Sequence, residues 1–194
     1  RIAKPHGRGY FPPVKEPQEY QRPRLTEALA LELLGSHFGL VGAVEPLPSW
    51  RDQNFRVVTD GGDRFILKIA NADEPMALLE LQAATLAFLD DRDIGVDLPR
   101  TVPTTIGDHG IAIRGDDGAT HWARLLTYLP GEVLGTIRPR TPALLESFGE
   151  AIGRLDAALL DFDHPAAARS DYIWDLTRAA EVIAADLSHV LDRE

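Results

Sequence analysis

The sequence contains no cysteine, so disulfides, thiolate metal sites and cysteine nucleophiles are excluded. No apolar run approaches the roughly 20 residues that a membrane-spanning helix needs. Basic residues are outnumbered, since 20 Lys and Arg stand against 30 Asp and Glu, which gives a formal net charge of −10. This balance argues against a nucleic-acid backbone or an anionic membrane as the partner, because both require clustered cations.

Other signatures are missing as well. The six histidines show no paired metal-ligand spacing, and the Gly-x-Ser-x-Gly pattern of serine hydrolases is absent. The chain opens on Arg1 without the apolar core of a signal peptide, which indicates a sequence cut from a longer one. With 44% hydrophobic residues and an acidic balance, we expect a globular cytoplasmic protein.

The distribution of prolines and the spacing of apolar residues divide the chain into three parts. Residues 1–24 carry five prolines and little apolar periodicity, which predicts an extended lead. Residues 25–131 mix strand and helix patterns and predict an α+β domain. From residue 132 onward the period is helical, with Thr141 as a cap and Pro142 as the first helical residue. Residues 132–194 are therefore expected to begin a helical lobe that is incomplete.

The elements expected inside these parts form one antiparallel sheet with helices. We expect about five strands in the sheet, although six segments of the chain carry a strand pattern, and the two helices of the last part carry apolar stripes that should pack together as a hairpin. Strand patterns occur at residues 41–47, 55–59, 64–69, 100–104, 110–114 and 119–128. Helical patterns occur at residues 25–38 and 76–89, from residue 142 and from residue 173, with Thr26 as a cap and Gly39 or Gly42 as the end of the first.

The hairpin within residues 49–70 is the most informative stretch. Its two strands are rich in β-branched and aromatic residues, and residues 60–63, Asp-Gly-Gly-Asp, suit a tight turn. Lys68 lies near the end of an otherwise apolar strand. Burying a lysine without a partner is costly, so Lys68 either reaches water or meets a fixed anion. Taken alone, a solvated edge lysine is the more common case.

The helix after this hairpin offers a carboxylate for the lysine. Pro75 starts it, and Glu80 lies beside its apolar stripe, which is expected to face the core. A helical carboxylate one element after a strand lysine is the arrangement in which kinases hold the lysine for the nucleotide α- and β-phosphates. Glu74 is the competing candidate. The stripe consists of Met76, Leu79, Ala83 and Leu86.

Four motifs follow one another along the chain, in the order LPSWRDQNF, FILKIAN, LLELQAATLAFL and RLLTYLPG. In that order they resemble the amino-terminal half of the aminoglycoside phosphotransferase family, and most of all its hydroxylysine kinase-like branch. The resemblance covers about residues 25–176. Such modules also occur fused ahead of peptidase-like and class III aminotransferase domains in long bacterial polypeptides, and this chain is similar to those fused versions. The resemblance implies a kinase-like fold, with residues 25–131 as the nucleotide-binding lobe.

The same resemblance implies the residues of a nucleotide site. Lys68, held by Glu80, would bind the phosphates of the nucleotide. The loop between the first two strands would cover these phosphates. Because this loop lacks a Gly-rich pattern, the alternative is that its polar side chains are ordinary turn residues. The segment before Pro130 would be the hinge that binds adenine, although a buried strand ending at a Pro-Gly turn is the alternative. The loop donors are Ser49, Arg51, Gln53 and Asn54, and the hinge residues are Leu126, Tyr128 and Leu129.

The residues that perform phosphoryl transfer are not found. Transfer needs an Asp that orients and deprotonates the acceptor hydroxyl, and an Asn and a second Asp that hold magnesium. No His-x-Asp-x-x-x-x-Asn pattern is present, and residues 161–163, Asp-Phe-Asp, are interpreted as a helix terminus. The implied cofactor is ATP with Mg²⁺, whose metal ligands are expected outside this chain.

The leading hypothesis is therefore the ATP-binding portion of a small-molecule phosphotransferase, inactive alone, whose parent phosphorylates a hydroxyl of an amino alcohol or hydroxylated amine. The expected partners are the nucleotide, the small-molecule acceptor and further domains of the same polypeptide. No nucleic acid and no membrane are expected. A non-catalytic regulatory or docking lobe, and an independent α+β binding protein with an accidental resemblance, are the alternatives.

Overall fold

The structure is a computed structural model that describes residues 22–116, 118–168, 176, 179–180 and 183–184. Contacts divide the chain into two units, Lys15–His164 and the combination of Arg1–Val14 with Pro165–Glu194. In the second of these the described residues include a short 3-10 turn, η3 (Pro165–Ala167). Most of the lead predicted for residues 1–24, and most of the helix predicted from residue 173, lie outside the described residues.

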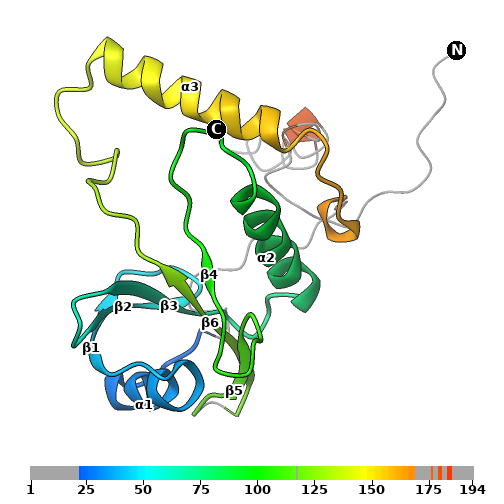
Figure 1. Cartoon of the computed structure of the whole chain (residues 1–194). Helices are drawn as coiled ribbons and strands as arrows, with labels where there is room; N and C mark the ends of the chain where they lie inside the picture. Colours follow the sequence, from blue (N-terminus) through cyan, green and yellow to red (C-terminus); the bar gives the residue numbers. More distant parts are fainter. Residues whose placement is uncertain (1–21, 117, 169–175, 177–178, 181–182, 185–194) are drawn as a thin grey trace, which may run out of the picture. The chain divides into compact units, whose positions relative to one another are not determined.

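The unit Lys15–His164 is built on one antiparallel sheet of six strands (Figure 1). The strand order is β1-β2-β3-β6-β4, and β5 also pairs with β6. Because β4 and β5 pair with different parts of β6, they lie end to end along its one edge, and the sheet is five strands wide. The predicted α+β fold is confirmed. The strands are β1 (Gly42–Leu47), β2 (Gln53–Thr59), β3 (Arg64–Ile69), β4 (Thr101–Val102), β5 (Ile111–Arg114) and β6 (Thr120–Thr127).

Helix α1 (Glu27–Leu33) covers one face of the sheet and encloses the core with it (Figure 1). Thr26 caps α1, because its side chain accepts a hydrogen bond from the Leu29 N–H at 3.2 Å. A π-helical turn, η2 (Leu34–Phe38), follows and ends at Gly39 with φ 65°. The core residues include Ala30, Leu34, Phe38, Phe55, Val57, Leu67, Ile69, Ala123 and Leu125.

The predicted hairpin is confirmed, with β2 and β3 paired from Gln53 opposite Ile69 to Val58 opposite Arg64. Gly62 in its turn has φ 89°, a conformation that suits glycine. Since Leu67 and Ile69 belong to the α1-covered core, alternation turns Lys68 to the opposite face of the sheet.

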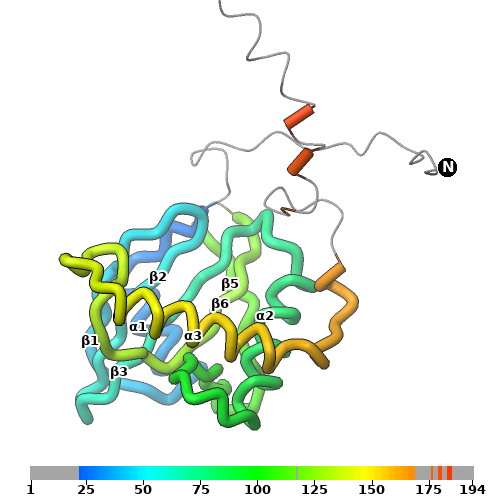
Figure 2. Tube along the Cα trace, turned by 90° about the horizontal axis from the view of Figure 1, so that it is seen from above, coloured from blue at the N-terminus to red at the C-terminus, as the bar shows by residue number. Residues whose placement is uncertain are grey.

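Helix α2 (Met76–Asp90) begins after Pro75, as predicted, and lies on the β6 side of the sheet in both views (Figures 1 and 2). Of the predicted apolar stripe, Leu79 is buried and Ala83 and Leu86 are half-buried, but Met76 is 44% exposed, so the prediction is wrong at this first residue of the helix. Gln82 of α2 accepts a hydrogen bond from Arg124 of the sheet.

Helix α3 (Pro142–Ala158) also starts as predicted, since Thr141 Oγ1 accepts from the Leu144 N–H at 3.2 Å. None of its residues is buried, and Leu145, Phe148 and Ile152 of its predicted stripe are exposed. Residues 161–163 follow the end of α3, where the ring of Phe162 lies 5.0 Å from that of Phe88. None of the described helices combines the length and apolarity needed to cross a membrane.

Candidate functional site

Three polar side chains form a row across the face of the sheet that α1 does not cover. Lys68 on β3 lies opposite Arg124 on β6, and on its other side it lies opposite Asn54 on β2. Directly opposed residues of antiparallel strands project to the same face, with Cβ atoms about 4.5–5.5 Å apart. The row therefore places two cations next to each other.

Both cations are taken out of water. Arg124 is only 7% exposed, and Lys68 is half-buried. Burial lowers the pKa of Lys68, and the positive charge of Arg124 lowers it further, whereas the carboxylate of Asp52 partly offsets this by raising it. Burial likewise lowers the pKa of Arg124, and the carboxylates of Asp52 and Glu74 partly offset this effect. The two cations therefore share Asp52 as a counter-charge.

The two carboxylates are fixed by neighbours outside the row. Asp52 Oδ1 accepts from the backbone N–H of Asn71 at 3.1 Å and from its Nδ2 at 3.0 Å. Glu74 Oε2 accepts from Arg51 Nη2 at 3.1 Å. Both contacts join the loop between β1 and β2 to the connection between β3 and α2. The loop is thus held against the end of β3 at which Lys68 lies.

Arg124 is tied to the helix. Its Nη2 donates to Gln82 Oε1 of α2. Its Nη1 is buried and has no hydrogen-bond partner among the described residues. The ammonium of Lys68 also makes no hydrogen bond or ion pair within that part of the chain. A buried arginine and a half-buried lysine with unused donors are chemically suited to bind an anion.

The segment predicted as the hinge spans the end of β6 and the residues after it. Leu126 is buried, the guanidinium of Arg64 lies 4.6 Å from the ring centroid of Tyr128, and Leu129 is 42% exposed. The Tyr128 N–H donates to the Arg64 carbonyl at 3.2 Å, so Leu129 is the first residue beyond this bond. The segment ends at Pro130.

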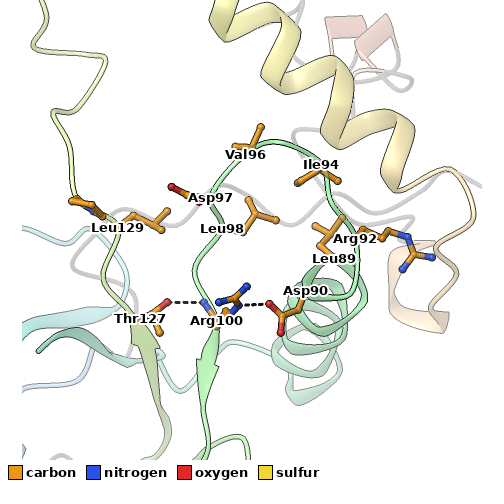
Figure 3. Close-up of a pocket in the computed structure, with 11 residues that line it drawn as sticks. Leu89, Asp90, Arg92, Ile94, Val96, Asp97, Leu98, Arg100, Thr127 and Leu129 are labelled. Atoms are coloured by element: carbon orange, nitrogen blue, oxygen red, sulfur yellow. Dashed lines mark hydrogen bonds and ion pairs between the residues drawn. The ribbon is translucent and has the colours of Figure 1, made fainter.

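A hollow of about 300 Å³ adjoins the predicted hinge (Figure 3). Leu129 borders it on one side and the end of α2 on the other, and Arg100 joins the two by donating its backbone N–H to Thr127 Oγ1 at 2.8 Å and pairing with Asp90. Its apolar lining comes from Leu89, Ile94, Val96, Leu98, Leu129 and Pro130. The hollow does not include Lys68 or Arg124.

The family model described as the phosphotransferase enzyme family, APH, matches residues 43–194. This chain belongs to that family. It is 34% identical over 165 residues to a hydroxylysine kinase of Danio rerio, and 35% identical over 179 residues to one of Bos taurus. These matches cover 80% and 84% of this chain but 46% of each relative, so the chain spans about half the length of the curated relatives it matches. The predicted family is confirmed.

Solved structures share the fold. An amicoumacin kinase in complex with AMP-PNP, Ca²⁺ and Ami matches with a TM-score of 0.66 and 18% identity, over 87% of this chain and 51% of that one. A microcompartment-associated aminopropanol kinase matches with a TM-score of 0.59 and 20% identity, over 78% and 46%. The kinase-like fold of this phosphotransferase domain is therefore confirmed.

The structure does not bring Glu80 of the phosphotransferase domain to Lys68. Glu80 is exposed on α2, and within the described part of the chain no ion pair joins it to the lysine. Glu74, the other candidate, pairs with Arg51 instead. The carboxylate that acts on Lys68 is Asp52, which sequence reasoning missed although it lies inside the WRDQNF motif.

The loop residues divide between two tasks. Asn54 Nδ2 donates to Ser49 Oγ at 2.8 Å, which holds these two side chains together beside Lys68. Gln53 instead accepts from the Leu25 N–H at 2.7 Å and donates to the Leu25 carbonyl at 2.8 Å. The amide of Gln53 thus anchors the approach to α1 and supplies no donor to the row.

The donor set fits a phosphate chain better than a bare metal ion. Lys68 and Arg124 are cationic donors, and Asn54 lies beside them. Among the described residues, no group of three or more His, Asp or Glu side chains is arranged to hold a metal ion. That the magnesium ligands lie outside this chain stays a prediction.

Proposed function

We propose that this phosphotransferase domain binds the phosphates of ATP, and that the protein which contains it phosphorylates a hydroxyl of a small amino alcohol or hydroxylated amine. The observation that carries the first part is the half-buried Lys68, whose ammonium has a lowered pKa and no hydrogen-bond partner within the described residues. The family match supports the reaction class. The names of relatives that act on hydroxylysine and aminopropanol support the acceptor class.

Each residue has a role in this proposal. Lys68 binds phosphate oxygens, and Asp52 keeps its ammonium charged and oriented in a partly buried place. The β1–β2 loop, joined to the β3–α2 connection by the Arg51–Glu74 ion pair, lies next to the phosphates, and Asn54 at the start of β2 lies beside Lys68. Magnesium, when bound with ATP, neutralises the charge that develops on the transferred group.

The remaining assignments complete the proposal. Residues 25–131 form the nucleotide lobe, with Leu126, Tyr128 and Leu129 along the adenine. Residues 132–194 begin the helical lobe, and the acceptor-binding and metal-binding residues belong to parts of the protein other than those described. Phosphate binding is thus the part of the function that this chain can test.

Thermal melting with and without ATP and Mg²⁺ tests it. At a ligand concentration 100 times Kd, binding adds about 2.7 kcal/mol to the free energy of unfolding, which corresponds to a Tm increase of roughly 5–10 °C. We expect Lys68→Ala to abolish most of this increase. Arg114→Ala is the matched control, because it removes an exposed cation from β5 of the same sheet. Equal protection of the wild type and Lys68→Ala would rule the proposal out.

A further inference from the structure

We propose that Arg124 is a second phosphate-binding cation of this site, which contacts the nucleotide together with Lys68 and whose position is set by Gln82 of α2. The proposal rests on the proposed function and deepens it. It concerns a residue to which the sequence patterns assigned no role, because an arginine in the middle of a strand is not distinctive by itself.

The position of Arg124 is the first argument. It lies directly opposite Lys68 in the β3–β6 ladder, so the two side chains leave the sheet on the same face. At 7% exposure the residue is too buried to be a solvated surface arginine. A buried like-charge pair is unfavourable unless an anion lies beside it.

The hydrogen bonds of Arg124 are the second argument. One terminal nitrogen is satisfied by Gln82 Oε1, but the other, Nη1, is buried and has no partner among the described residues. An unsatisfied buried donor destabilises the fold, and more so when it is charged. A guanidinium donates hydrogen bonds in a planar arrangement that suits the oxygens of a phosphate group. A phosphate near Lys68 would satisfy Nη1.

The shared counter-charge is the third argument. Lys68 and Arg124 are both acted on by the carboxylate of Asp52, and Arg124 also by that of Glu74. Glu74 pairs with Arg51, and one oxygen of Asp52 accepts two hydrogen bonds from Asn71. A ligand that carries several negative charges would give the two cations a further counter-charge.

A structural role is the rival account, in which Arg124 only attaches α2 to the sheet through Gln82. The two accounts differ in what they predict for a ligand without phosphates. If Arg124 contacts phosphate, its loss weakens the binding of ATP and leaves the binding of adenosine unchanged. If Arg124 only attaches α2, its loss weakens the binding of both ligands alike, or lowers Tm without changing the ratio of the two affinities.

Calorimetric titration of the full chain with ATP and Mg²⁺, and separately with adenosine, tests the proposal. We expect Arg124→Gln to lower the affinity for ATP about tenfold or more while the affinity for adenosine stays the same. Arg124→Lys, which keeps a cation at the same position of β6, should recover part of the affinity for ATP and replaces the glutamine variant if that variant folds poorly. Arg114→Gln is the matched control on the exposed β5.

The outcomes separate the two proposals. An unchanged ATP affinity in Arg124→Gln and Arg124→Lys, or an equal loss for ATP and adenosine, overturns the role of Arg124 and leaves the proposed function standing. A wild-type chain that does not bind ATP overturns the proposed function, and the role of Arg124 with it.

Discussion

At the scale of single residues, Lys68 shows how a charge is accommodated in an apolar strand. Its neighbour across the ladder is another cation, and its counter-charge is Asp52 on the preceding loop. From its place in the strand, Lys68 was expected either to reach water or to meet a fixed anion, and the kinase-like resemblance favoured the anion. The identity of the carboxylate did not, because Asp52 reaches the site through its bonds to Asn71, a tertiary contact that no periodicity records.

The titration of Lys68 gives a residue-level prediction. Burial lowers its pKa below the ordinary value of 10.5, so its neutral, nucleophilic form is populated at lower pH than that of an ordinary lysine. We expect the rate of acylation of Lys68 to rise with pH around a midpoint below 10.5. Lysine occurs only at Lys4, Lys15 and Lys68, so peptide mass spectrometry follows each one separately.

Two variants decide which carboxylate acts on Lys68. Asp52→Asn should move the acylation midpoint to lower pH, because the lost carboxylate favoured the charged ammonium. Glu80→Gln should leave the midpoint in place, since Glu80 is exposed and unpaired with Lys68 within the described residues. A shift in Glu80→Gln without one in Asp52→Asn would restore the assignment that the sequence alone favoured.

At the scale of elements, the sequence predicted what is decided locally. Thr26 and Thr141 cap their helices through side-chain oxygens, and Gly62 supplies the left-handed residue of the hairpin turn. The apolar stripe of α2 was predicted correctly at Leu79, which is buried, and wrongly at Met76, the first residue of the helix, which is 44% exposed. Local chemistry thus located the elements, whereas the exposure of a helix end depends on what packs against it.

The pairing of β1 with β2 leads to a prediction about two glycines. A Cβ at Gly42 would lie 2.2 Å from the Val58 carbonyl oxygen and 2.6 Å from the Thr59 Cα, both backbone atoms that cannot move without separating the strands. At Gly61 in the turn, the nearest atom would be 3.7 Å away. We expect Gly42→Ala to lower the free energy of unfolding by about 2 kcal/mol or more, and Gly61→Ala by less than about 0.5 kcal/mol.

Urea denaturation of both variants measures this difference. The slope of the transition should be unchanged, because neither substitution alters how much surface unfolding exposes. Similar losses in the two variants would mean that β1 can shift on β2, and that their register is not fixed as described.

At the scale of the whole molecule, burial is unevenly distributed along the unit Lys15–His164. The core lies between α1 and the sheet, whereas α3 buries no residue. The order of motifs along the sequence was enough to predict the family and the kinase-like fold. An apolar stripe predicts only that a helix has a side suited to burial, and Phe148 on α3 is 48% exposed all the same.

Two phenylalanines test this distribution. Phe55 on β2 is 1% exposed and belongs to the core, so Phe55→Ala should lower the free energy of unfolding by about 3–5 kcal/mol. Phe148→Ala should lower it by less than about 1 kcal/mol, because half of that ring already contacts water and alanine favours the helix. Chemical denaturation followed by circular dichroism measures both. Equal losses would show that the apolar side of α3 is covered in solution, and the core would then extend beyond α1 and the sheet.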